Sequence, residues 1–268
     1  MKTKKIISIG VQVIIVFIFF VTINLLYIPT KKPKLIIDLQ KEVVNINPDF
    51  VKVISLGQNR LISSFLWIST LLKADLKHYE KDDYNNWMFL RLKLVTALSP
   101  MFYQGYLYGG VYLSIIKDDE IGAKYIYDKG IEKYPYDHPL LFNSGFHHFS
   151  ELSDYPAAIS LFQRALDNGA TQPFLPTLLA RLKSGEGNLI DARYLLLNTL
   201  KTTPKRSPIY KKIILALYAI NAELDLECLN SSKLNCSSND YFGNRYIQTN
   251  GKYLAVKEWQ KYRIKKGK

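Results

Sequence analysis

The residues that could do chemistry in this 268-residue chain are few and scattered. His147 and His148 are adjacent, so on a helix their side chains point about 100° apart and cannot serve one ligand site from the same face. By the register of the chain's repeats, we expect His148 to pack in the core and His147 to face solvent. His78 and His138 lack acidic or cysteine partners at the spacing of metal ligands. The histidines therefore predict no metal site.

Other motifs of known active sites are missing from the sequence. The stretch SGEGN at Ser184 to Asn188 fits an inter-helix turn better than a phosphate loop. There is no serine elbow, paired-histidine zinc motif or nucleophilic cysteine setting. We predict that the chain is not an enzyme and has no cofactor or metal. An envelope enzyme whose site residues are scattered is a remote alternative.

Three phenylalanines have the spacing of a binding surface. Phe142, Phe146 and Phe149 lie at i, i+4 and i+7, which is one face of a helix. Exposed aromatic residues of this kind dominate the energetics of protein interfaces. The corresponding positions of the neighbouring stretches hold Leu107, Val111 and Ser114 before, and Thr177, Arg181 and Ser184 after. We predict a groove for a protein partner here, or, if residues 50–98 cover the phenylalanines, a part of the core.

These positions correspond because the stretch from Tyr103 to Pro204 repeats at the length of one helix pair. Gly110 to Gly145 is 35 residues, as is Ala123 to Ala158, and Ala158 to Ala192 is 34. Periods of this length indicate stacked supersecondary units that bury their apolar faces against each other. We predict three units, at about 103–137, 138–172 and 173–206.

Small residues recur where two antiparallel helices must approach closely. The predicted packing residues are Gly110, Ala123, Gly130, Gly145, Ala158, Ala165, Ala180 and Ala192. A large apolar residue stands four positions after the small residue that opens each second helix: Tyr127, Phe162 and Leu196. This pattern resembles the tetratricopeptide repeat, a helix–turn–helix of 34 residues. The resemblance implies an α–α superhelix whose first helices line an inner groove. The first two units carry one extra residue in the inter-helix turn.

The segments around the repeats complete the expected architecture. Residues 50–100 read as a divergent helical pair that caps the first unit, with an apolar stripe of Leu61, Phe65, Leu66, Ile68 and Leu72. Residues 207–230 are expected to form a capping helix, and 231–268 a cysteine-containing loop, a β-hairpin at Asn250-Gly251 and a basic tail. The predicted fold class is all-α, a tetratricopeptide-like solenoid with an N-terminal transmembrane helix and a small C-terminal β-hairpin.

An uncharged apolar run occupies residues 6–28. At about 1.5 Å per residue it would reach roughly 34 Å as a helix, enough to cross a bilayer. We predict a single membrane span, with residues 1–5 as a cytoplasmic tail and 29–49 as a linker. A cleaved signal peptide is the alternative, but the run is too long and no small-x-small cleavage site follows it. The predicted location is the inner membrane of a bacterium, with the larger domain in the periplasm.

Charge and cysteine content limit the possible partners and the compartment of the chain. The formal net charge is +13, and much of it lies at the two ends of the chain, which argues against nucleic acid as the partner. Cys228 and Cys236 are eight residues apart in a Ser- and Asn-rich loop. They either close a disulfide in an oxidising compartment or remain two free thiols.

One further resemblance bears on function. The stretch SLGQNRLISSFLWIS, followed by LVTALSPMF and the repeats, resembles a group of bacterial membrane-anchored tetratricopeptide proteins of undefined role, over about residues 50–205. It carries over no catalytic residues. We expect a protein-binding scaffold that helps to assemble or organise a cell-envelope complex, such as a secretion or pilus machine. The alternative is a structural spacer that acts through its hairpin and basic tail.

Overall fold

The computed structural model describes residues 17–19, 21–22, 39–41, 44–81, 83–231, 233 and 235–264. The chain divides into two compact units, residues 1–42 and 43–268. Most of the predicted span at 6–28 lies outside the described residues; 17–19 and 21–22 are helical. Within the part that the structure describes, no helix is both long and apolar enough to cross a membrane. The membrane span therefore stays a prediction.

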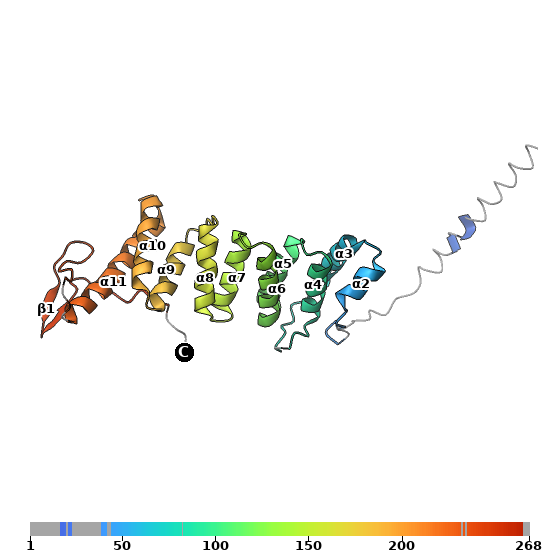
Figure 1. Cartoon of the computed structure of the whole chain (residues 1–268), viewed down its shortest axis with the longest axis horizontal. Helices are drawn as coiled ribbons and strands as arrows, with labels where there is room; N and C mark the ends of the chain where they lie inside the picture. Colours follow the sequence, from blue (N-terminus) through green and yellow to red (C-terminus); the bar gives the residue numbers. More distant parts are fainter. Residues whose placement is uncertain are drawn as a thin grey trace, which may run out of the picture. The chain divides into compact units, whose positions relative to one another are not determined.

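Residues 43–268 are mostly helical, so the predicted all-α class is confirmed. In Figure 1 the helices of this unit follow one another in chain order; from α3 onward each packs against its neighbours in the chain, whereas α2 packs against α4. They are α2 (Pro48–Ile54), α3 (Asn59–Leu72), α4 (Trp87–Leu98), α5 (Tyr103–Val111), the π-helical turn η1 (Tyr112–Ile116), α6 (Glu120–Lys133), α7 (His138–Ser150), α8 (Tyr155–Asp167), α9 (Leu175–Gly185), α10 (Leu189–Thr202) and α11 (Pro208–Asn230). The most extensive contacts join α3 to α4, α5 to α6, α7 to α8 and α9 to α10.

The turns inside three of these pairs share one conformation. Asp118, Ser153 and Gly187 all have a positive φ, at 51°, 52° and 87°. The residue after each is the N-cap of the second helix: Asp119 of α6, Asp154 of α8 and Asn188 of α10. Each cap side chain accepts a hydrogen bond from a backbone N–H in the first turn of its helix. The same local chemistry therefore starts the second helix in all three helix pairs, α5–α6, α7–α8 and α9–α10.

The extra residue of the first two turns has a definite place. The N–H of Asp119 donates to the carbonyl of Leu113, and that of Asp154 to the carbonyl of His148, six residues back in both cases. In the third unit the N–H of Asn188 donates to Lys183, five residues back. The additional residue is thus absorbed between the end of the first helix and the cap, and in the first unit the π-helical turn η1 takes it up.

Small residues lie where the helices approach most closely. A Cβ added to Gly110 would lie 2.4 Å from the ring of Tyr127, and one added to Gly145 would lie 2.8 Å from the ring of Phe162. At Gly130 an added Cβ would meet Tyr106 at 2.7 Å. The structure buries all eight packing positions that the sequence singled out: Gly110, Ala123, Gly130, Gly145, Ala158, Ala165, Ala180 and Ala192. An aromatic ring over a glycine therefore joins the helices of the first two units.

The C-terminal region is tied to the end of α11. Cys228 and Cys236 form a disulfide. Strands β1 (Ile247–Thr249) and β2 (Lys252–Leu254) pair antiparallel around Asn250 and Gly251, whose φ values of 50° and 78° suit a tight hairpin turn. The side chain of Asn230, the last residue of α11, bonds to both the N–H and the carbonyl of Tyr253. The predicted hairpin is present, and it is held against α11.

Candidate functional site

Helix α7 carries the candidate site. Its N-cap is Asp137, whose carboxylate accepts a hydrogen bond from the N–H of Leu140. Phe142, Phe146 and Phe149 lie along one side of the helix; Phe146 is 41% exposed and the other two are half-buried. Residues 50–98 therefore leave this side of α7 open, and the groove alternative is favoured over the core alternative.

The three phenylalanines belong to a connected group of rings. The ring centroids of Phe142 and Phe146 are 6.3 Å apart, and those of Phe146 and Phe149 are 6.1 Å apart. Phe149 also contacts Tyr155 at 6.2 Å, and Phe142 contacts Phe174 at 6.0 Å. These five residues form the aromatic patch.

The aromatic patch is rigidly supported from below. Phe142 contacts the fully buried Phe162 at 5.9 Å between centroids, and Phe142, Phe149 and Tyr155 pack on the apolar core around Leu141. At its outer edge Phe174 is 47% exposed. The sequence reasoning missed Phe174, although its place just before Leu175 and Pro176, at the start of a helix, could have suggested it. A preformed aromatic surface loses little side-chain entropy when a partner binds.

The first unit contributes less to the groove than predicted. Leu107 is buried rather than lining a groove, and Val111 is half-buried. Helix α5 contacts three other helices, α4, α6 and α7, which leaves little of its surface open. Ser114 and Ser184, the positions that correspond to Phe149, are buried as well. The open surface is therefore centred on the second unit.

The prediction that His147 faces solvent is wrong. His147 is 1% exposed: its Nε2 donates to the carbonyl of Glu120 at 3.0 Å, and its Nδ1 lies 2.8 Å from Ser114 Oγ. Its ring is turned toward the preceding unit, with Tyr127 at 5.8 Å. Burial lowers the pKa of His147 to about 4. His148 is also buried, as predicted, and its Nδ1 lies 3.1 Å from the Asp154 carboxylate.

The chain's own C-terminal segment occupies the groove beside the aromatic patch. The hydroxyl of Tyr262 donates to the carbonyl of Thr177 at 2.9 Å, and the Arg181 guanidinium lies 5.0 Å from the centre of the Tyr262 ring. Arg181, which we predicted to line the groove, thus holds an aromatic side chain there. Residues 255–264, which we name the tail, contain neither helix nor strand.

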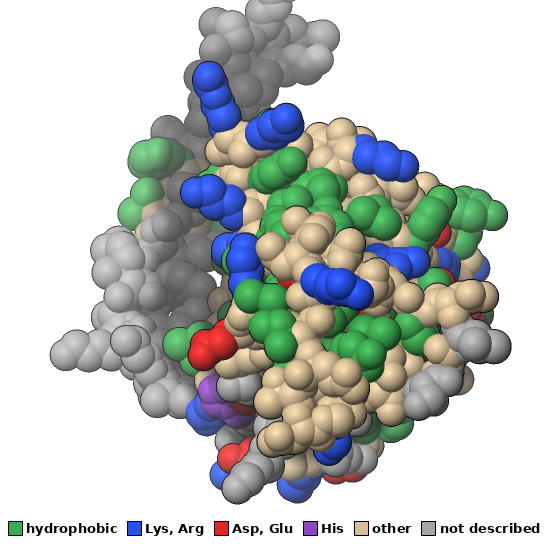
Figure 2. Space-filling model, turned by 90° about the vertical axis from the view of Figure 1, so that its left-hand side faces the viewer, with side chains coloured by type: hydrophobic (Ala, Val, Ile, Leu, Met, Phe, Trp, Pro, Cys, Tyr) green, Lys and Arg blue, Asp and Glu red, His purple; other side chains and the backbone are tan. Residues whose placement is uncertain are grey.

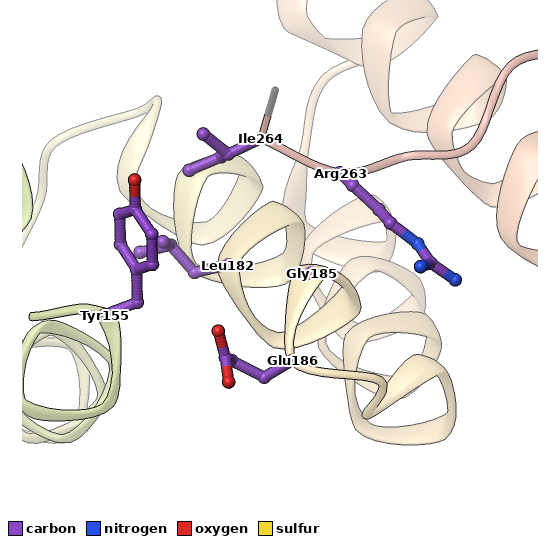
Figure 3. A pocket seen from close by; sticks show the side chains of 6 residues that line it. All are labelled: Tyr155, Leu182, Gly185, Glu186, Arg263 and Ile264. Carbon is purple, nitrogen blue, oxygen red and sulfur yellow. The ribbon is translucent and has the colours of Figure 1, made fainter. Parts of the chain in front are cut away.

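Charged and apolar contacts fix the rest of the tail. Lys261 and Arg263 pair with the carboxylate of the buried Glu223 in α11. Ile264 packs against the apolar core that also supports Phe149 and Tyr155. Figure 3 shows Ile264 pointing to the side of Tyr155 and Leu182, whereas Arg263 points away from them. The described part of the tail therefore ends next to the aromatic patch.

Open space remains on both sides of the tail. A cavity of about 290 Å³ is lined by Tyr155, Leu182, Glu186 and Ile264, among others, and Figure 3 shows its walls. A second cavity, of about 390 Å³, lies along Tyr262 between α9 and α11. Figure 2 views the molecule from the end that carries α11 and the hairpin in Figure 1; on this face Lys and Arg side chains lie among hydrophobic ones and acidic side chains are sparse.

Comparison with known proteins supplies no assignment. No protein-family model matches the chain, and no curated protein is significantly similar to it.

The candidate site combines aromatic, charged and backbone polar groups. Among the residues that the structure describes, no cluster of three or more His, Cys, Asp or Glu side chains could hold a metal ion. The groove contains aromatic rings, the exposed guanidinium of Arg181, the backbone carbonyl of Thr177 and the buried carboxylate of Glu223. These groups suit a peptide with aromatic, basic and aliphatic side chains.

Proposed function

We propose that this chain is a membrane-anchored scaffold of tetratricopeptide-like repeats, which binds a peptide segment of another protein along the inner face of its first helices. The partner is a protein of the bacterial cell envelope, and the scaffold helps to assemble or organise the complex to which that partner belongs. Binding is centred on the aromatic patch. The scaffold needs no cofactor and performs no catalysis.

The observation that carries this proposal is the exposure of Phe146 and Phe174 within the aromatic patch. Five aromatic rings pack together here, and Phe146 and Phe174 among them are exposed to solvent. The packing of the fold does not require these two rings to be exposed. Preformed, well-supported aromatic anchors at the centre of a surface are typical of binding hot spots. The recurring caps, left-handed turn residues and glycine–aromatic contacts support the repeat assignment.

The tail supports the kind of ligand that we propose. It lies in the groove as an irregular peptide, with a tyrosine on Arg181, a backbone acceptor bonded at Thr177 and an isoleucine on the core. A partner peptide with an aliphatic or aromatic residue would extend this line of contacts across the aromatic patch. A disulfide between Cys228 and Cys236 suits the periplasmic location that we propose.

A second candidate function is a spacer that acts through its C-terminal hairpin. Ile247, Leu254 and Val256 are exposed there, which favours a contact by the hairpin itself. Deleting residues 240–268 would abolish the function of such a spacer, whereas substitutions in the aromatic patch would leave it intact.

The test is co-purification of cross-linked partners from membranes. We expect Phe146→Asp to reduce recovery of the partner about tenfold or more, because a hot-spot residue contributes about 2 kcal/mol or more to binding. Tyr194→Asp is the matched control, since Tyr194 is also an exposed aromatic residue within a helix. The proposal fails if wild type, Phe146→Asp and Tyr194→Asp recover the same proteins in the same amounts.

A further inference from the structure

Helix α3 turns large apolar side chains outward. Leu61, Phe65, Ile68 and Leu72 are spaced i, i+4, i+7 and i+11, so they lie along one face, which we name the outer stripe. All four are more than half exposed; Phe65 reaches 71% and Leu72 82%. A helix on the surface of a water-soluble domain normally presents polar residues there.

The opposite face of α3 is mixed, with the half-buried Ile62, Leu66 and Trp67 beside two polar residues. The polar ones, Ser63 and Thr70, are seven residues apart and almost completely buried. The Ser63 hydroxyl donates to the carbonyl of Val95 in α4 at 3.0 Å, and the Thr70 hydroxyl donates to Leu66 within α3 at 2.6 Å. Between these residues, Ile62 and Leu66 pack on the small core formed by Val51, Leu94 and Leu98. Contact with α4 is therefore complete without the outer stripe, and the fold does not account for the stripe's hydrophobicity.

The unpaired charges on α3 and at its C-terminal end are basic. Arg60 and Lys73 are exposed, whereas Lys52 of α2 pairs with Asp49 at 2.9 Å and Asp75 pairs with Lys117. Helix α2 adds exposed apolar residues at Phe50 and Val53. An apolar helix face with exposed Arg and Lys at its two ends, and with the nearby carboxylates of Asp49 and Asp75 already paired, is suited to the interface of a bilayer with anionic lipids.

We propose that the outer stripe of α3 inserts into the surface of a membrane that contains anionic phospholipids. This contact is separate from the aromatic patch and goes beyond the scaffold function. The predicted span at residues 6–28 would favour it, because the linker at 29–49 would keep α3 close to the bilayer. The outer stripe supplies the buried apolar surface, and Arg60 and Lys73, which lie at the two ends of α3, supply attraction to phospholipid headgroups.

The experiment uses the full chain with a photoreactive phenylalanine analogue in place of Phe65, reconstituted into vesicles of phosphatidylethanolamine and phosphatidylglycerol. Because Phe65 is exposed, the analogue leaves the fold intact. The control carries the same analogue at Tyr194, an exposed aromatic position of α10. After illumination, mass spectrometry identifies what is attached at each position.

We expect lipid adducts at position 65 in severalfold excess over position 194. Adducts that join two copies of the chain at position 65, or a lipid yield no higher than at position 194, would overturn the proposal. Illumination in cells gives a second readout: lipid adducts support the proposal, and adducts to another protein at position 65 contradict it. Alkaline extraction of the same membranes tests the span at 6–28 independently, so failure of the anchor and failure of the outer stripe are distinguishable.

Discussion

At the scale of single residues, His147 links two successive units. Its two ring nitrogens contact Ser114 and the carbonyl of Glu120, which belong to the preceding unit, while its backbone belongs to α7. Because a carbonyl oxygen only accepts, Nε2 carries the proton and Nδ1 accepts from the Ser114 hydroxyl in the neutral ring. The buried site therefore favours neutral histidine, in line with its lowered pKa.

The first prediction concerns the pH dependence of stability. In the folded chain the pKa of His147 is about 4, below its ordinary value of 6.5. Between pH 6.5 and 4, His147 is therefore protonated in the unfolded chain but neutral in the folded chain. The stability that neutral His147 contributes is fully present above pH 6.5 and declines as the pH falls toward 4. We expect the loss to be about 3 kcal/mol.

Denaturant titrations of the detergent-solubilised chain at several pH values measure this loss. The control is His147→Gln, whose amide can bond to both partners but does not titrate. We expect the pH dependence between 6.5 and 4 to be smaller in this variant by the amount that His147 contributes. An unchanged pH dependence would show that His147 does not stay neutral in the folded chain.

At the scale of elements, the contacts between helices depend on glycines under aromatic rings. The second prediction is that Gly145→Ala destabilises the chain by about 1–3 kcal/mol, because the new methyl group would lie 2.8 Å from the buried ring of Phe162. Gly185→Ala is the matched control: it is also a helical glycine, with no atom within 4 Å of an added Cβ and no positive φ. That substitution should be neutral or slightly stabilising. Equal midpoints for the two variants in denaturant titrations would contradict the packing described for α7 and α8.

The helices and the small residues at their close contacts were predictable because their signal in the sequence is periodic. A small residue facing an aromatic or aliphatic one recurs at 34 or 35 residues, and steric necessity fixes both types. The hairpin was predictable from Asn250-Gly251 because few residues tolerate two successive positive φ values.

Other features were not predictable, since they depend on contacts between distant parts of the chain. Nothing local to Leu107 reveals that α5 is in contact with α4, α6 and α7, and nothing local to His147 reveals Ser114 beside it. The tail in the groove joins residues far apart in sequence: Tyr262 to Thr177, and Arg263 to Glu223. The burial of Ser63 in α3 was also not predictable, because polar residues are normally expected on the exposed side of a helix. Ser63 permits a close approach to α4 that a large apolar residue would prevent.

At the scale of residues 43–268, the tail connects the C-terminal end of the chain to the candidate site. It starts after the hairpin, crosses α11 at Glu223 and reaches the core beside the aromatic patch at Ile264. If the inner face binds peptides of this kind, the tail is its first ligand, and an arriving partner either extends from it or displaces it. Whether the partner extends from the tail or displaces it, the groove must bind a peptide that is not covalently part of the chain.

The most direct measurement is therefore the binding of a labelled synthetic peptide of residues 255–268 to the chain from which residues 258–268 have been removed, followed by fluorescence anisotropy. We predict saturable binding that Arg181→Glu weakens about tenfold, since it removes the cation–π contact with Tyr262 and places a carboxylate next to the negative face of that ring. Lys201→Glu, an equal change of charge at an exposed position of α10, should have little effect. No saturable binding, or the same loss with Lys201→Glu as with Arg181→Glu, would contradict the claim that the inner face is a peptide-binding groove.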